Sequence, residues 1–180
     1  MSVMSRSVRA ARPGADEYAS YYEPYVMRVP DGDIVRTLDE QVVETLALLA
    51  SLPEERGGRR YEPGKWSIRE VIGHMCDAER IFTYRATRFA RADATELPGF
   101  DENAYVANAR FDSRTLSSLA DEFEAVRWAS VAFYDSLEDA ELMRRGVANH
   151  VPVSVRALGW ITAGHERHHL EVLRTRYLNG

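Results

Sequence analysis

Residues 154–178 read SVRALGWITAGHERHHLEVLRTRYL, the most informative stretch of the chain for its fold. Apolar side chains such as Leu158 and Val172 recur at three- or four-residue intervals, which is typical of an amphipathic helix. His165 and His169 belong to the same stripe, and a spacing of four residues on a helix separates them by one turn, about 6 Å. The stretch therefore predicts a helix that carries two imidazoles on its inward face.

Three further segments have the same helical period: residues 31–52, 67–93 and 113–137. Pro53 ends the first, and Ser67 with Glu70 forms a capping box at the start of the second. The inward stripe of the third segment is predicted to be Leu116, Leu119, Ala120, Phe123, Val126, Ser130 and Phe133. Only residues 147–153 read as a short extended piece, so an all-α four-helix bundle is expected.

The connections indicate how the helices are ordered. Residues 91–112 form a long link, with a short helix expected at 102–108, and this length allows the second and third helices to run parallel through a crossover. A group of aromatic side chains precedes the first helix and is expected to dock over the bundle: Tyr18, Tyr21, Tyr22 and Tyr25.

Composition places the chain among globular proteins without membrane spans. It has 180 residues, of which 45% are hydrophobic and 28% charged, and it contains no run of about 20 apolar residues that could cross a bilayer. Residues 1–16 are expected to be a disordered lead, followed by a single domain over 17–180. The first residues lack the apolar core of a secretory signal, so a cytoplasmic location is expected.

Charge and cysteine content narrow the possible partners. The net charge is −5 and the arginines are interleaved with acids, which argues against binding to nucleic acid. Cys76 is the single cysteine, so the chain cannot form an internal disulfide, and this side chain is predicted to be a small buried hydrophobe.

A third histidine, His74, lies on the inward face of the second helix, between Val71 and Ala78. Each buried imidazole needs partners for both of its nitrogens, and one shared metal ion would supply a partner to all three rings. Helical rise brings His74 to the level of His165 and His169 only when the second and fourth helices are antiparallel. The sequence therefore predicts a metal site between antiparallel helices.

The two remaining histidines are expected to lie outside this site, and one sequence motif suggests a competing function. His168 lies to the side of the ligand face and is predicted to be a rim residue, and His150 is predicted to be exposed in a loop. Residues 165–169 also satisfy His-Glu-x-x-His, in which Glu166 would be the general base of a zinc protease. Too few residues follow His169 to supply a third downstream ligand, so the protease interpretation is not favoured.

Several longer stretches together resemble the DinB/YfiT-like superfamily of metal-dependent enzymes. They are GKWSIREVIGH at 64–74, YRATRFAR at 84–91, LPGFDE at 97–102 and AGHERHHL at 163–170. The resemblance implies an up-down-down-up four-helix bundle and a divalent metal ion, nickel or zinc, held by His74, His165 and His169. It also implies a low-molecular-weight thiol as a cosubstrate.

The predicted activity is the transfer of such a thiol to a small electrophilic substrate, because a bound divalent ion lowers the pKa of a thiol. Asp77 and Glu70 lie one turn from His74 and are candidates for orienting a ligand or moving a proton. Their alternative roles are a surface salt bridge for Asp77 and the capping box for Glu70.

Arg85 and Arg88 extend the His74 face and are candidates for binding the anionic part of a carboxylate-bearing thiol. Their alternative role is pairing with Glu122 or Glu124. Two other functions remain open: a hydrolase that uses a metal-bound hydroxide, and a metal-binding bundle without catalytic activity. A homodimer is possible, although no sequence feature identifies its interface.

Overall fold

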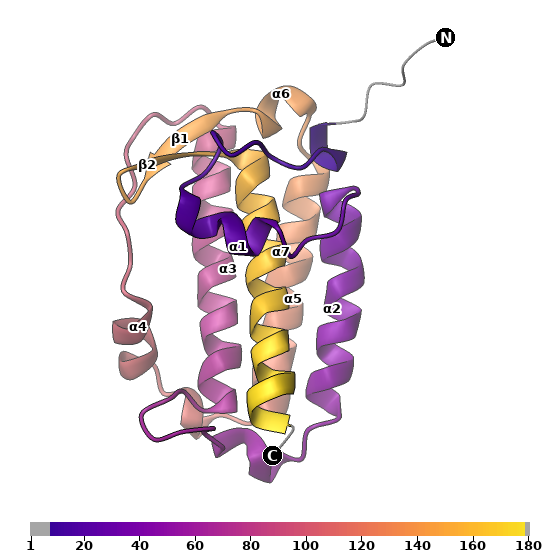
Figure 1. Ribbon diagram of the computed structural model, residues 1–180, viewed down its shortest axis with the longest axis vertical. Coiled ribbons are helices and arrows are strands. Elements are labelled where there is room, and N and C mark those ends of the chain that lie inside the picture. Colours follow the sequence, from indigo (N-terminus) through magenta and orange to yellow (C-terminus); the bar gives the residue numbers. More distant parts are fainter. Residues whose placement is uncertain (1–7, 179–180) are drawn as a thin grey trace.

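The computed structural model describes residues 8–178, in which four long helices pack side by side (Figure 1). They are α2 (Ile34–Ala50), α3 (Ile68–Ala90), α5 (Leu116–Asp135) and α7 (Val155–Val172), and a π-helical turn, Leu173–Leu178, continues α7. Each long helix lies inside its predicted segment, so the all-α prediction is confirmed.

Side-chain caps explain where the long helices begin. The Asp33 carboxylate accepts the Val35 N–H at 2.9 Å, and the Ser154 hydroxyl accepts the Ala157 N–H at 3.0 Å. The expected capping box at Ser67 and Glu70 is present at the start of α3. These contacts satisfy main-chain donors that would otherwise lack partners in the first turn.

The order of the helices produces the expected up-down-down-up topology (Figure 1). Helices α2 and α3 are antiparallel, α3 and α5 run in the same direction, and α7 is antiparallel to α3. The crossover between α3 and α5 contains α4 (Glu102–Asn108) and a 3-10 turn at Phe111–Ser113. Among the described residues no helix is both long and apolar enough to cross a membrane.

A small hairpin closes one end of the bundle. Strands β1 (Arg145–Ala148) and β2 (Val151–Ser154) pair antiparallel, after the short helix α6 (Asp139–Leu142), and they include the predicted extended piece. The Leu97 N–H donates to the Val147 carbonyl and the Asn149 N–H donates to the Leu97 carbonyl, both at 2.9 Å. These two bonds hold the crossover against the hairpin.

The N-terminal segment crosses the outside of the bundle against α7 (Figure 1). It contains 3-10 turns at Val8–Ala10 and Ser20–Tyr22 and the short helix α1 (Glu23–Val26). Residues 1–7 of the expected disordered lead lie outside the described residues. Residues 8–16 are held in place, since Arg12 donates to the carbonyls of Val26 at 2.6 Å and Val29 at 2.8 Å.

The inward stripe of α5 differs from the prediction in its second half. Leu116, Leu119, Phe123 and Ser130 are buried as expected, but Arg127 and Tyr134 are fully buried where Val126 and Phe133 were expected. The prediction was wrong because a buried arginine is unusual without a partner, and the partners of Arg127 come from other helices.

A further 3-10 turn, Glu54–Gly58, links α2 to α3. Cys76 is buried, as predicted.

Candidate metal centre

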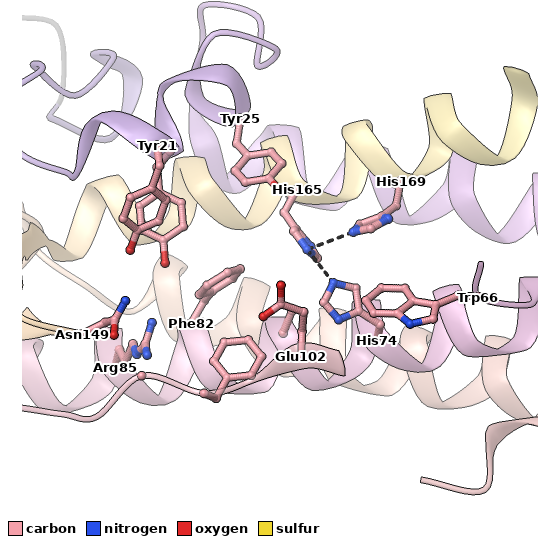
Figure 2. Close-up of a pocket in the computed structure, with 14 residues that line it drawn as sticks. Tyr21, Tyr25, Trp66, His74, Phe82, Arg85, Glu102, Asn149, His165 and His169 are labelled. Atoms are coloured by element: carbon pink, nitrogen blue, oxygen red, sulfur yellow. Dashed lines mark hydrogen bonds between the residues drawn. The ribbon is translucent and has the colours of Figure 1, made fainter. Parts of the chain in front are cut away.

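Three imidazoles meet at one point in the bundle (Figure 2). His74 comes from α3, whereas His165 and His169 come from successive turns of α7. The His165 Nε2 atom lies 3.0 Å from Nε2 of His74 and 3.1 Å from Nε2 of His169. The antiparallel packing of α3 and α7 therefore brings together the three histidines that the sequence predicted as a set.

Hydrogen bonds among the three rings cannot give each of the facing ring nitrogens its own partner. A ring nitrogen has either one N–H or one in-plane lone pair, so Nε2 of His165 can form one hydrogen bond, yet it faces two neighbouring nitrogens. A shared cation would accept all three lone pairs at once. Nitrogen ligands about 2.0–2.1 Å from one tetrahedral ion lie about 3.3 Å apart, close to the two distances from His165, and all three ligand atoms lie within 4.8 Å of one another.

Burial keeps these rings in the neutral form that binds metals. Burial lowers the pKa of His74 to about 4, and the charge of His168 acts in the same direction. The pKa values of His165 and His169 are also lowered well below the usual value, first by burial and then by the neighbouring histidines. Three neutral imidazoles fit a divalent ion such as zinc or nickel.

The triad forms part of the wall of a cavity of about 340 Å³. Figure 2 shows His74, His165 and His169 at one end and Arg85 with Asn149 at the other. Most of the remaining lining residues are aromatic or apolar: Tyr21, Tyr22, Tyr25, Trp66, Ala78, Phe82 and Phe100. The site therefore combines an apolar body with a few polar groups, as small-molecule sites usually do.

A second cavity, of about 310 Å³, reaches His169 from another direction. It is lined by His168, Lys65 and Tyr61, and Trp66 contributes to the walls of both cavities. The Trp66 ring centroid lies 4.7 Å from that of His74. The two cavities therefore share Trp66 and His169, whereas only the first is lined by all three imidazoles.

The N-terminal segment covers the triad through Tyr25. Its ring packs against His165 at 5.5 Å and against the rim residue His168 at the same distance. Gly164 permits this contact, because a Cβ at that position would collide with the main-chain carbonyl oxygen of Tyr25. The glycine before His165 thus lets the aromatic segment dock closely, and the predicted docking of the tyrosines over the bundle is confirmed.

The two candidate arginines occupy different environments. Arg85 is buried and lines the first cavity, as the sequence suggested. Arg88 does not line this cavity, because its guanidinium pairs with the Asp93 carboxylate and contacts the Tyr84 hydroxyl. Neither arginine pairs with Glu122, which binds Arg80 and Arg114 instead. Arg88 therefore lies outside the cavity and is not part of the site.

The two candidate carboxylates on α3 also lie outside both cavities. Glu70 bonds the Ser67 N–H at 2.8 Å in the capping box and forms an ion pair with Arg60. Asp77 lies 3.6 Å from Arg80, and partial burial raises its pKa. Both residues therefore have the alternative structural roles considered from the sequence, and neither faces the triad.

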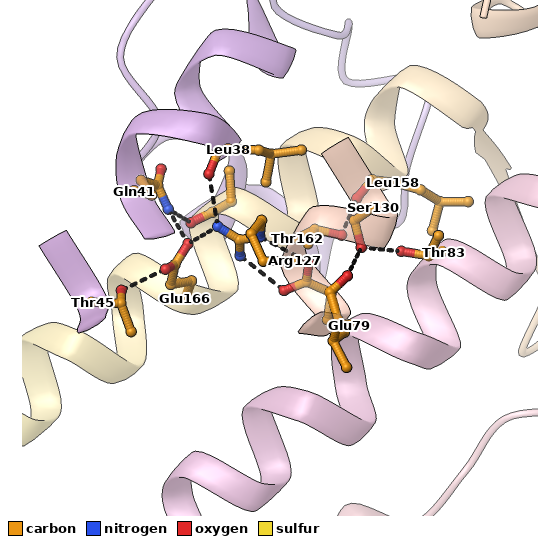
Figure 3. Close-up of polar contacts among 12 residues, drawn as sticks. Leu38, Gln41, Thr45, Glu79, Thr83, Arg127, Ser130, Leu158, Thr162 and Glu166 are labelled. Carbon is orange, nitrogen blue, oxygen red and sulfur yellow. Dashed lines mark hydrogen bonds and ion pairs between the residues drawn. The ribbon is translucent and has the colours of Figure 1, made fainter. Parts of the chain in front are cut away.

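Glu166 points away from the imidazoles into a second buried cluster (Figure 3). We define the Arg127 cluster as Arg127, Glu79, Glu166, Gln41 and Thr45. Arg127 binds both oxygens of Glu79 at 2.8 Å and one oxygen of Glu166 at 2.7 Å, and Thr45 donates to the other at 2.5 Å. Glu166 is therefore unavailable as the general base of the protease motif.

Sequence reasoning assigned no role to Glu102 and Asn149, although both line the first cavity. Figure 2 shows the Glu102 carboxylate between Phe82 and His74, directed into the cavity. Glu102 lies in the LPGFDE stretch, but its place in the cavity could not be predicted, because the fold of the crossover brings α4 beside α3.

His150 is exposed, as predicted, and contacts Glu96 at 2.7 Å.

The fold and site define a class of protein, namely a four-helix bundle with three convergent histidines beside a cavity. A family model described as the DinB superfamily matches residues 37–173, and the chain belongs to this superfamily. No curated protein sequence matches the chain.

Two solved structures are similar to it. One is YfiT from Bacillus subtilis, described as a probable metal-dependent hydrolase with an unusual four-helix bundle topology. Its TM-score is 0.64 with 17% identity, covering 91% of this chain and 92% of that one. The other is a mycothiol-dependent maleylpyruvate isomerase, with a TM-score of 0.65 and 10% identity, covering 81% of this chain and 61% of that one. At these identities the likeness establishes the fold.

Proposed function

We propose that this protein is an enzyme that transfers a low-molecular-weight thiol to a small electrophile, with nickel or zinc held by His74, His165 and His169. The observation that carries the proposal is the convergence of three neutral Nε2 atoms, with spacings of 3.0 and 3.1 Å, at the wall of a cavity. A structural zinc site normally has four protein ligands, whereas the described residues supply a group of three.

A divalent ion held by the three neutral imidazoles would supply the acidity that the chemistry needs, because such an ion lowers the pKa of a thiol. The Glu102 carboxylate, which points into the same cavity, accepts the thiol proton. Phe82 and Tyr25 pack against His165 and limit access of water to the reacting atoms.

The presence of two cavities favours transfer between two substrates. The first cavity holds Glu102 and Arg85, the second holds Lys65 and His168, and both include Trp66 and His169. A thiol and an electrophile could therefore approach the triad from different directions, separated by the indole ring. The isomerase with a similar fold is mycothiol-dependent, which supports a thiol as one of the two substrates.

Hydrolysis is the second candidate, favoured by the likeness to YfiT over 91% of this chain. In this alternative Glu102 accepts a proton from water rather than from a thiol. The two functions are separated by one comparison: a hydrolase forms product without thiol, whereas a transferase requires it.

The first test is the metal content of protein purified without an affinity tag, measured by elemental analysis. We expect one divalent ion per chain in the wild type, and His165→Gln should lower metal affinity by more than about 100-fold, since it removes a direct ligand. His150→Gln is the matched control, because His150 is exposed, contacts Glu96 and lines neither cavity. Equal metal content in both variants would contradict the site.

The second test is activity. Metal-loaded protein is incubated with bacillithiol, mycothiol, glutathione or coenzyme A and a generic electrophile, and compared with metal-free protein. We expect thiol-dependent product only in the loaded wild type and a strong loss of turnover in Glu102→Gln. A rate no higher than that of the metal-free protein with every thiol would refute the transferase.

A further inference from the structure

The end of the first cavity opposite the triad is built around a buried arginine. Arg85 is only 4% exposed and donates to the Pro98 carbonyl at 2.9 Å. Its guanidinium also lies 5.9 Å from the ring centroid of Phe100. Figure 2 shows Arg85 beside Asn149, across the cavity from the imidazoles.

No carboxylate within residues 8–178 forms an ion pair with Arg85. Other buried or half-buried arginines of the chain have such partners: Arg127 binds Glu79 and Glu166, and Arg156 binds Glu17. A buried guanidinium normally requires a counter-charge, because removal from water penalises an isolated charge. Arg85 instead contacts a neutral carbonyl, the Tyr22 hydroxyl and the face of an aromatic ring, none of which balances its charge, so this charge is open to an anionic ligand.

The groups around Arg85 are neutral and polar. Asn149 lies in the hairpin turn with a φ of 52°, and its N–H is held by the Leu97 carbonyl at 2.9 Å. The Tyr21 side chain points its hydroxyl toward this end of the cavity (Figure 2). Burial and the hydrogen bond with Tyr21 raise the pKa of Tyr22, while Arg85 acts to lower it, so this hydroxyl stays protonated and neutral. A planar anion would find several donors here.

We propose that this end of the cavity binds the carboxylate of a small organic acid, whose opposite, reacting end is placed at the histidine triad. The role of this acid as a substrate rests on the proposed function. Its binding at this end of the cavity does not depend on that function. A guanidinium is suited to a carboxylate because its parallel N–H groups match the two oxygens.

The fold also defines the shape of the acid. His74 and Arg85 are eleven residues apart on α3, about 16 Å of helical rise, although both side chains extend into the cavity and shorten this span. Ala78 and Phe82 lie between them and line the cavity. The ligand is therefore elongated and apolar in its middle, with its carboxylate remote from the atom that reacts.

Binding is tested by calorimetry on the metal-free full chain, so that neither the ion nor turnover contributes. The probes are benzoate, cinnamate and 4-phenylbutyrate, each compared with its neutral amide. We expect the acid that fits best to bind about tenfold more tightly than its amide, as expected for loss of one charge-assisted contact. No acid binding better than its amide would overturn the proposal.

Three variants test whether the preference for an acid over its amide arises at Arg85 and Asn149. Arg85→Gln should abolish it, and Asn149→Asp should weaken acid binding about tenfold by placing a like charge at the site. Asn149→Asp keeps the shape of the side chain and tolerates positive φ, so it remains informative if Arg85→Gln fails to fold. Arg88→Gln is the control on the same helix and should leave the preference unchanged. Retention of the preference in Asn149→Asp or in folded Arg85→Gln would overturn the assignment.

Turnover by the metal-loaded enzyme then identifies which substrate carries the carboxylate. The KM of either the electrophile or the thiol should rise in Asn149→Asp, and the affected substrate is the occupant of this cavity. If acids bind with the expected preference but no thiol supports turnover, the proposed function fails while the carboxylate site stands. If turnover occurs without any preference for acids, only the carboxylate site fails.

Discussion

The histidine triad and the Arg127 cluster are both buried polar groups, and His165 of one is adjacent in sequence to Glu166 of the other. The triad joins α3 to α7, whereas the cluster joins all four long helices. In the Arg127 cluster every charged group binds protein partners, since one guanidinium spans two carboxylates and Thr45 and Gln41 complete the contacts of Glu166. In the triad, three neutral nitrogens face one another.

This difference separates a structural cluster from a binding site. Burial alone lowers the pKa of Arg127, but the carboxylates of Glu79 and Glu166 outweigh it and raise the pKa above the usual value. The cluster is thus stable in its charged form without any ligand. The triad places lone pairs where the protein offers no donor, and it lies at a cavity wall. Polar groups that lack partners within the protein are the ones that bind something else.

The largest expected effect is the loss of stability when the Arg127 cluster is broken. Arg127→Met removes the cation and leaves two buried carboxylates without their partner, so the free energy of unfolding should fall by about 3–5 kcal/mol. Urea denaturation of the metal-free protein measures this change. Arg36→Met is the control, because the Arg36–Glu40 pair is exposed and its loss should leave stability nearly unchanged. Similar stabilities for the two variants would show that the cluster is not structural.

The second prediction concerns acid pH and the metal-free triad. The folded-state pKa of His74 is about 4, below the reference value of about 6.5, so the unfolded chain binds more protons between these values. Stability should be fully present above pH 6.5 and should fall as the pH drops toward 4, by up to about 3 kcal/mol from His74 alone. Unfolding curves across this range test it. His74→Gln should make the curve less steep, although His165 and His169 still contribute. An equally steep curve in that variant would contradict the assignment.

The third prediction separates the two clusters by their response to metal. At a free concentration of nickel or zinc 100 times the dissociation constant, binding should stabilise the folded state by about 2.7 kcal/mol. For a chain of this size the melting temperature should rise by roughly 5–10 °C. Scanning calorimetry with and without the ion measures the shift, and His165→Gln should abolish it. A shift of equal size in that variant would place the ion elsewhere.

The smallest effect is expected at Gly164, where α7 contacts the main chain of Tyr25. Gly164→Ala forces the added methyl group against the Tyr25 main chain, so the aromatic segment must move away from His165. Stability should fall by about 1–3 kcal/mol, the usual cost of overpacking, and thiol-transfer activity should fall with it. Gly58→Ala is the control, since its nearest neighbour would be at 3.8 Å. Unchanged activity in Gly164→Ala would show that the tyrosine cover is dispensable.

Much of the fold and part of the site could be predicted from local patterns. Apolar periodicity located all four long helices, and the four-residue spacing of His165 and His169 placed both rings on one face. The burial of Arg127 could not be predicted, because its partners Glu79 and Glu166 come from two other helices. Arg85 and Arg88 also look equivalent in sequence, and only the position of Asp93 and the cavity distinguishes them.

Local residue patterns were enough to predict the helices, the histidine face of α7 and the resemblance to a superfamily of metal-dependent enzymes, since these depend on residue types at short spacings. Contacts between distant segments were needed to show that Glu166 faces Arg127, that Glu102 and Asn149 reach the cavity, and that Arg85 has no counter-charge among the described residues. These features join segments that are distant in the chain, and their contacts form only when the crossover and the hairpin pack against the bundle.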